Sequence, residues 1–367
     1  MAGSDFGTIF KITTWGESHG KGLGVVVDGC PAGLPLDESM IQTFLDRRKP
    51  GQSKYTTPRK ESDRVEILSG VFKGRTTGTP ISMLVRNENQ NSKDYREIAS
   101  YYRPGHADFT FDAKYGFRDY RGGGRSSGRE TIGRVAAGAI ASLLLQKLGI
   151  QILTFTRSIG PIQCDMTLFD ETEISKNRLC MPDAKAARAA ESYLDQCMEE
   201  KNSCGGVIEC IITGVPAGIG DPVFEKLDAS LAKAIFSIGA VKGFEIGDGF
   251  AAAASTGSEN NDPFCRSASG QITKASNHAG GILGGISDGS PIVFRAAIKP
   301  TPSIARPQNT VRTDGSSVTV EISGRHDPVI VPRAVVVVES MAAITLADFL
   351  LKSMGDQVAN VISFYAP

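Results

Sequence analysis

Residues 24–33 read Gly-Val-Val-Val-Asp-Gly-Cys-Pro-Ala-Gly, a β-branched run that ends in a Pro-Ala-Gly turn. The same order recurs at 206–218, where Gly-Val-Ile-Glu leads to a second Pro-Ala-Gly. Further pairs follow in the same order, 74–81 with 285–292 and 141–145 with 347–351, each separated by slightly more than half of the chain. Three ordered pairs predict an internal duplication within one domain, with halves of about 1–185 and 186–367.

Local patterns predict similar strand-helix-strand units in both halves. Runs rich in β-branched residues predict strands at 25–27 and 207–212. Apolar residues at i, i+3, i+4 spacing predict a helix at 129–148, and Ser127-x-x-Glu130 resembles a capping box at its start. Other helices are expected at 37–47, 184–200 and 224–237, whereas 335–351 is expected to begin as a strand or an apolar segment and continue as a helix.

The composition excludes several classes of protein. The 40 basic and 40 acidic residues balance, which argues against a nucleic-acid or membrane-surface partner. No uninterrupted apolar stretch approaches the roughly 20 residues of a membrane span, and the N-terminus does not resemble a signal peptide. The 7 cysteines show no Cys-x-x-Cys spacing, which indicates reduced thiols and no structural metal site. We therefore expect a cytoplasmic protein.

Glycine is over-represented, with 41 copies. It gathers at 16–20, 122–128 and 280–285, between apolar runs that predict strands and helices. Such clusters mark backbone that turns tightly or approaches a ligand closely, so ordered loops are favoured over flexible linkers.

Four histidines are candidates for proton transfer near neutral pH. His19 and His106 lie in glycine-flanked turns, where a ligand can come close, although both are also compatible with purely structural turn histidines. His278 is more readily explained as structural, and the role of His326 is ambiguous.

Basic and hydroxyl groups indicate an anion site. Residues 125–129, Arg-Ser-Ser-Gly-Arg, precede the predicted helix, where backbone N–H groups and the helix dipole attract anions; a simple cap is the alternative. The basic run 47–54 is either a solvated face or one wall of a site for a polyanion. In the second half, 299–303 adds basic and hydroxyl groups, and Asp327 next to Arg325 is expected to stay ionised, or to form only a local ion pair. These residues predict an enzyme for an anionic small molecule that uses histidine acid–base chemistry, and they leave the reaction open.

Five motifs in order resemble those of the chorismate synthase family. They are Gly-Glu-Ser-His-Gly at 16–20, Arg-Pro-Gly-His-Ala-Asp at 103–108, Arg-Ser-Ser-Gly-Arg-Glu-Thr at 125–131, Asn-His-Ala-Gly-Gly at 277–281, and Arg325-x-Asp327-Pro328. The resemblance extends from about residue 7 to about residue 352. It implies an α+β fold, a β-α-β sandwich of two pseudo-symmetric halves with helices layered between antiparallel sheets, and assembly as a homotetramer.

The resemblance also implies a reaction. Family members are lyases that make chorismate from 5-enolpyruvylshikimate 3-phosphate by 1,4-anti elimination of phosphate, and they need reduced FMN without net redox change. By this resemblance His19 would protonate the leaving phosphate, His106 would protonate or stabilise the reduced flavin, and Asp327 would assist proton removal at flavin N5. Bifunctional members also use NADPH to reduce the flavin.

The same resemblance assigns the contacts of each ligand. FMN would contact Arg125, Ser126, Ser127, Gly239, Ala240, Gly284, Lys299, Pro300, Thr301, Pro302, Ser303 and Arg325. Substrate anions would meet Arg48, Lys54, Arg103, Arg129 and Arg134, and NADPH in bifunctional members is suggested to bind near Arg48 and position 54. Lys54 departs from the arginine that the family often has, which keeps the charge but loses the bidentate fork.

We expect a site between the two halves, because the assigned residues come from both. Two other classes of protein stay open at this point. A binding or scaffold protein for a phosphate ligand would bind without turnover, and a conventional flavin reductase would consume NADPH stoichiometrically.

Overall fold

Two antiparallel sheets enclose a layer of helices. The computed structural model describes residues 3–56, 61–88, 97–268, 270, 272–322 and 327–366, without the side chain of residue 97. Within these residues the larger sheets have five strands each. The first sheet has the order β1 (Asp5–Phe6), β2 (Lys11–Gly16), β3 (Gly22–Asp28), β7 (Ile81–Arg86), β4 (Val65–Ile67), and the second has the order β11 (Val241–Ile246), β16 (Ile292–Ile298), β10 (Gly206–Thr213), β8 (Gln151–Ile159), β9 (Ile162–Gln163).

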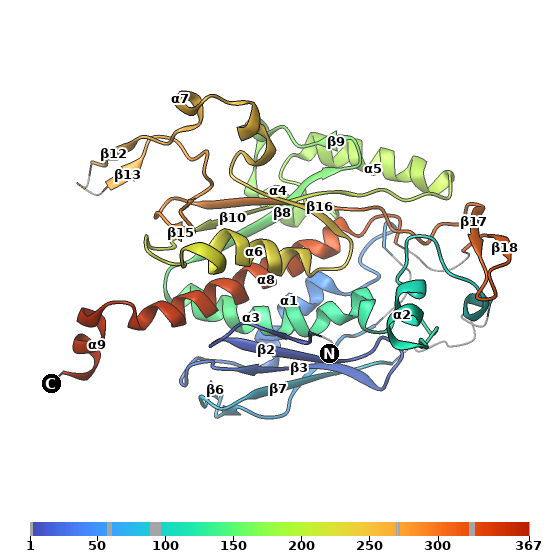
Figure 1. The fold of residues 1–367 in the computed structure, drawn as a ribbon, viewed down its shortest axis with the longest axis horizontal. Coiled ribbons are helices and arrows are strands. Elements are labelled where there is room, and N and C mark those ends of the chain that lie inside the picture. Colours follow the sequence, from blue (N-terminus) through green and yellow to red (C-terminus); the bar gives the residue numbers. More distant parts are fainter. Residues whose placement is uncertain are drawn as a thin grey trace.

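The helices between the sheets are α1 (Glu38–Arg48), α3 (Thr131–Lys147), α6 (Leu227–Phe236) and α8 (Val331–Lys352), as Figure 1 shows. This arrangement confirms the expected α+β sandwich. It also confirms the strands expected at 25–27 and 207–212, and the helices at 37–47, 129–148 and 224–237 are present with slightly different ends.

The two sheets repeat one topology. The repeated unit leaves out the edge strands β1 and β9. In the first copy β2 and β3 are neighbours, α1 follows, and β7 inserts between β3 and β4. In the second copy β8 and β10 are neighbours, α6 follows, and β16 inserts between β10 and β11. A small hairpin precedes that last strand in both copies, β5 (Val71–Phe72) with β6 (Arg75–Thr76) and β14 (Ile282–Leu283) with β15 (Ile286–Ser287). The second copy begins at β8, so the topology divides the chain at 148–150 and not near 185. The difference arises because residues 160–205 form an excursion between the first two strands of the second copy.

The remaining elements lie outside the two larger sheets and the helical layer between them. Helix α5 (Ala184–Glu199) confirms the amphipathic helix expected at 184–200. The others are α2 (Asp108–Tyr115), α4 (Glu171–Lys176), α7 (Gly257–Asn260), α9 (Val358–Tyr365), and the hairpins β12 (Phe264–Arg266) with β13 (Ile272–Lys274) and β17 (Gln308–Val311) with β18 (Ser317–Val320).

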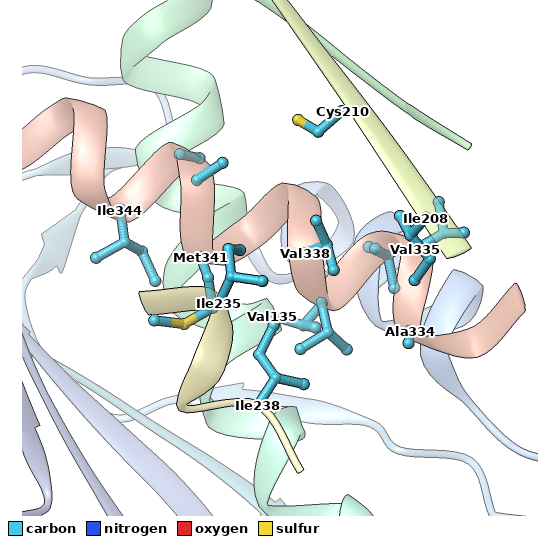
Figure 2. Packing of buried hydrophobic residues seen from close by; sticks show 14 of the residues in the cluster. Val135, Ile208, Cys210, Ile235, Ile238, Ala334, Val335, Val338, Met341 and Ile344 are labelled. Atoms are coloured by element: carbon cyan, nitrogen blue, oxygen red, sulfur yellow. The ribbon is translucent and has the colours of Figure 1, made fainter. Parts of the chain in front are cut away.

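Helix α8 is the central element of the core. It is helical from Val331 onward, and Pro332 lies in its first turn. Of the two alternatives for the start of 335–351, the strand was therefore wrong and the apolar segment leading into a helix is confirmed. By length and composition α8 could cross a membrane, contrary to our expectation, but most of it is buried inside the protein. A helix that is apolar on all sides is a core helix when protein surrounds it. Figure 2 shows Val335, Val338 and Met341 among buried side chains of the core.

Helices α3 and α8 approach each other closely at Gly138. A Cβ atom at this position would lie 2.2 Å from the Cβ and 2.5 Å from the Cα of Ser340. Because each helix belongs to a different copy of the repeat, this contact joins the two halves in one core.

Candidate active site

A pocket of about 530 Å³ lies between the two halves. The first half contributes Arg48 at the end of α1, residues 105–107, residues 125–128, and Glu130, Thr131 and Arg134. The second half contributes residues 237–240, Lys299, Thr301, Pro302, Asp327, and residues at and just before the start of α8. The expected position of the site between the halves therefore corresponds to a real cavity.

The pocket is positively charged. The described residues that line it include more basic side chains than carboxylates. The basic side chains are those of Arg48, Arg125, Arg134, Lys299 and Arg333, and the carboxylates are those of Glu130 and Asp327. The N-terminal ends of α3 and α8 also lie at the pocket and contribute the positive ends of their dipoles. In a protein with no net charge, this concentration of cations favours an anionic ligand.

The loop before α3 forms one wall. Two 3-10 turns, Gly124–Ser126 and Gly128–Glu130, precede the helix, and the Ser127 hydroxyl accepts a hydrogen bond from the Arg129 amide at 3.3 Å. The expected capping box does not form, because the Glu130 carboxylate accepts from the Thr14 hydroxyl at 2.8 Å and from Arg134 at 2.7 Å.

Arg125 fixes the same loop to the first sheet. Its guanidinium donates to the carbonyl and the hydroxyl of Thr14 at 3.1 and 2.7 Å. A Cβ atom at Gly128 would meet nothing within 4 Å, so the backbone there is open to a ligand. Ser126 and Ser127 line the pocket beside it.

His106 is held across the two halves. One of its ring nitrogens, Nε2, lies 2.7 Å from the hydroxyl of buried Ser303, and the Lys299 ammonium donates to the Gly105 carbonyl at 2.9 Å. His106, Lys299, Thr301 and Pro302 line the pocket, whereas Ser303 acts behind His106. Pro300 is not among the lining residues.

Asp327 faces the pocket from just before α8. Its carboxylate accepts from the Arg333 guanidinium at 2.6 Å, and Arg333 also donates to the Arg48 carbonyl at 3.1 Å. Arg325, assigned to FMN by resemblance, and His326 lie outside the described residues.

His19 lies behind the pocket wall. Its Nδ1 is 3.0 Å from the Ser18 hydroxyl, and its ring packs so closely on Gly122 that a Cβ atom there would lie 2.5 Å from it. The side chain is buried and does not line the pocket.

The predicted substrate arginines divide into two groups. Arg48 and Arg134 line the pocket. Arg103 and Arg129 do not: Arg103 forms a bidentate ion pair with Asp108 at 2.7 and 2.8 Å, and Arg129 donates to buried Asp63 at 3.0 Å. Lys54 lies away from the pocket and pairs with Asp195 at 2.7 Å.

Asp63 connects the arginines that line the pocket with those that do not, because its carboxylate binds both Arg48 and Arg129. Burial raises the pKa of this carboxyl, but the two guanidinium groups outweigh burial and hold the pKa below its usual value. Sequence reasoning missed Asp63, Glu130 and Arg333 as site residues. Only the basic character of the region was a signal for them.

The residues of the second half that were predicted to contact FMN also divide into some that line the pocket and some that do not. Gly239 and Ala240 line the pocket, and Ala240 has a positive φ of 74°, which is unusual for a residue with a side chain. Gly284 forms the turn between β14 and β15 and is not a lining residue. Among the described residues, no cluster of His, Cys, Asp and Glu has the composition to hold a metal ion.

The fold and the pocket together define a duplicated α+β sandwich protein with a positively charged pocket between its halves. A family model for chorismate synthase matches residues 10–351. Chorismate synthases of Lachnoclostridium phytofermentans and Agathobacter rectalis are each 69% identical over 365 residues, covering 100% of this chain and 100% and 99% of theirs. A solved structure described as a crystal structure of chorismate synthase is 34% identical, with a TM-score of 0.76 over 98% of this chain and 96% of that one.

The chain belongs to the chorismate synthase family. It is accordingly a lyase of the shikimate pathway.

Proposed function

We propose that this lyase converts 5-enolpyruvylshikimate 3-phosphate to chorismate by 1,4-anti elimination of phosphate, with reduced FMN and no net redox change. The observation that carries the proposal is the meeting of His106 and Asp327, from opposite halves, in one cationic pocket. A proton donor and a proton acceptor are what the departure of phosphate and of a ring hydrogen requires.

The charge of the pocket suits this substrate. The substrate carries a phosphate and two carboxylates, and Arg48 and Arg134 offer guanidinium groups from two helices. Guanidinium groups bind carboxylates and phosphates through paired hydrogen bonds. Among the described residues the Nε atom of Arg48 has no hydrogen-bond partner, so a ligand oxygen would satisfy it.

The pocket also fits FMN. In the part of the chain that the structure describes, Gly128 and Gly239 leave open space where a Cβ would point, and the buried Thr301 hydroxyl has no partner. Apolar surface comes from Ile238, Pro302 and Val337. The residues that would hold the cofactor are those predicted for FMN that also line the pocket: Arg125, Ser126, Ser127, Gly239, Ala240, Lys299, Thr301 and Pro302. When bound, reduced FMN would supply an electron for the elimination and recover it afterwards.

The protein side chains would manage the protons. His106 can hold a proton on the ring that Ser303 orients, and the Asp327 carboxylate can accept one. His19 lies behind Gly122, so its proposed protonation of the phosphate needs a path past this loop.

The decisive experiment is anaerobic. Purified protein, 5-enolpyruvylshikimate 3-phosphate and chemically reduced FMN are mixed, and chorismate and phosphate are measured together. We expect equal, catalytic release of both without net flavin oxidation. Flavin binding without product would contradict the reaction, and stoichiometric NADPH consumption would favour a reductase.

A pair of histidine variants separates catalysis from ligand binding. His106→Ala should lower kcat by about 10²–10⁴-fold, as expected for loss of an acid–base group. His278→Ala is the matched control, because His278 pairs with Asp248 outside the pocket. Equal activity of the two variants would contradict an acid–base role for His106.

Further properties are proposed from the resemblance alone. Use of NADPH by this chain is tested by replacing the chemical reductant with NADPH in the same assay. A homotetramer is tested by light scattering. A cytoplasmic location is supported by the cysteines, all 7 of which are free thiols.

A further inference from the structure

Arg333 lies where a helix does not favour a cation. It is in the first turn of α8, next to Pro332, and positive charge there opposes the helix dipole. Its side chain is only 19% exposed and lines the pocket. A residue whose charge destabilises its own helix is a candidate for a functional role.

The contacts of Arg333 connect two parts of the site. One nitrogen donates to the Asp327 carboxylate at 2.6 Å, and Nε donates to the backbone carbonyl of Arg48 at 3.1 Å. The side chain therefore spans from the segment before α8 to the end of α1, which belongs to the other half. This places the Asp327 carboxylate at a fixed position relative to Arg48.

We infer that Arg333 is a positioning residue of the proposed reaction: it orients the Asp327 carboxylate in the pocket. The inference rests on the proposed function, in which Asp327 accepts a proton. The other charged and titratable groups lining the pocket are Arg48, His106, Arg125, Glu130, Arg134 and Lys299.

The test compares Arg333→Gln, Arg333→Lys and a matched control. Arg157→Gln is the control, because Arg157 also binds a carboxylate, Glu209 at 3.4 Å, and a backbone carbonyl, that of Cys164 at 2.5 Å, but lies outside the pocket. Both glutamine variants thus lose the same kinds of contact. Urea unfolding of each shows what the contacts contribute to folding.

In the anaerobic assay, Arg333→Gln should lower kcat by about 100-fold while KM stays near the wild-type value, because the reacting group is misplaced after binding. Arg333→Lys should restore part of kcat, because an ammonium group can still pair with the Asp327 carboxylate. A change in KM with kcat unaffected would overturn the inference and make Arg333 a substrate-binding residue. Kinetics like those of Arg157→Gln would also overturn it.

A second measurement does not depend on turnover. In protein with ¹³C-labelled aspartate, the Asp327 signal is assigned by its absence in Asp327→Asn, and its chemical shift at neutral pH is compared in the wild type and in both Arg333 variants. We expect a displaced signal in Arg333→Gln, because the contact with the guanidinium is lost, and an unchanged signal would overturn the inference. If the wild type makes no chorismate but the signal still moves, the proposed reaction fails and the pairing of Arg333 with Asp327 stands. If Arg333→Gln does not fold, Arg333→Lys carries both measurements.

Discussion

Asp63 is the residue on which the arrangement of the basic groups depends most. Its carboxylate has no exposed surface and binds the guanidinium groups of Arg48 and Arg129. Its backbone has a positive φ of 46°, a conformation that aspartate and asparagine tolerate better than most residues. Asparagine at this position therefore removes the charge with little effect on the backbone.

We expect Asp63→Asn to lower the free energy of unfolding by about 3–5 kcal/mol, because removal of one partner leaves buried positive charge uncompensated. Urea denaturation at neutral pH measures this loss. Asp46→Asn is the control, since Asp46 forms an exposed pair with Lys49 on the same helix, worth about 1 kcal/mol or less. Similar losses in the two variants would contradict the importance of the buried charge.

The same carboxyl predicts a pH dependence of stability. The pKa of Asp63 is lower in the folded protein than the ordinary value of 3.8, so the unfolded chain binds the proton more tightly. Its stabilising effect is complete above the ordinary value and is lost as the pH falls through the lower folded value. We expect the free energy of unfolding to fall below about pH 4, and to fall less steeply in Asp63→Asn.

Asp108, whose pKa is likewise held low by Arg103 against the effect of burial, contributes in the same direction. The acid loss in Asp63→Asn should therefore be reduced and not abolished. Urea unfolding at a series of pH values measures both curves, and parallel curves would show that Asp63 does not contribute.

Sequence reasoning found the residues of the site that lie in local motifs. The turn with His106 and the loop 125–127 line the pocket because glycine and hydroxyl residues favour open, ligand-facing backbone. It did not find Asp63 or Arg333, since their partners are distant in the sequence and the pairs form only in the folded chain. For the same reason it could not separate Arg48, which lines the pocket, from Arg129, which is buried against Asp63.

At the scale of elements, the contact between α3 and α8 determines how closely the helices of the middle layer pack. Gly138→Ala would place a Cβ atom 2.5 Å from the Ser340 Cα, so backbone must move. We expect a net loss of about 1–3 kcal/mol in the free energy of unfolding, although alanine favours a helix over glycine by about 1 kcal/mol. Urea denaturation measures the change.

Gly257→Ala in α7 is the matched control for this prediction. A Cβ atom there would meet nothing within 4 Å, so the substitution should be neutral or slightly stabilising. A Gly138→Ala protein as stable as Gly257→Ala would show that the two helices can separate without cost.

The error at the start of α8 has a physical cause. Four consecutive valines, Val335 to Val338, favour a strand locally, but the segment is surrounded by protein on all sides as a helix of 22 residues. Burial of a complete apolar helix outweighs the modest β preference of its residues. Helix 184–200 was predictable because it buries one side more than the other, with Ala186, Ala190 and Leu194 buried, so its apolar spacing is visible.

At the scale of the whole molecule, the duplication could be recognised from short repeats, because both copies keep the same turns beside the same strands. Its boundary could not be placed. The excursion 160–205 lengthens the second copy between its first two strands, and the spacing of the repeats does not reveal where such an insertion lies.

The arrangement of the core predicts that the two halves unfold together. Buried residues of both copies form one cluster, in which α3 and α8 pack between the two sheets. Neither half could keep its helix buried without the other, so separation would expose apolar surface on both. We therefore expect one cooperative unfolding transition for the chain.

Two reporters at opposite sheets can test this cooperativity. Trp15, the only tryptophan, lies in β2 of the first sheet, and Cys210 is fully buried in β10 of the second. Tryptophan fluorescence and pulsed alkylation of Cys210, followed by peptide mass spectrometry, should give the same urea midpoint. Gly138→Ala should shift both midpoints equally, because it acts on the contact that joins the halves. A shift of one midpoint alone would mean that each half forms its own folding unit, and the pocket between them would then open without global unfolding.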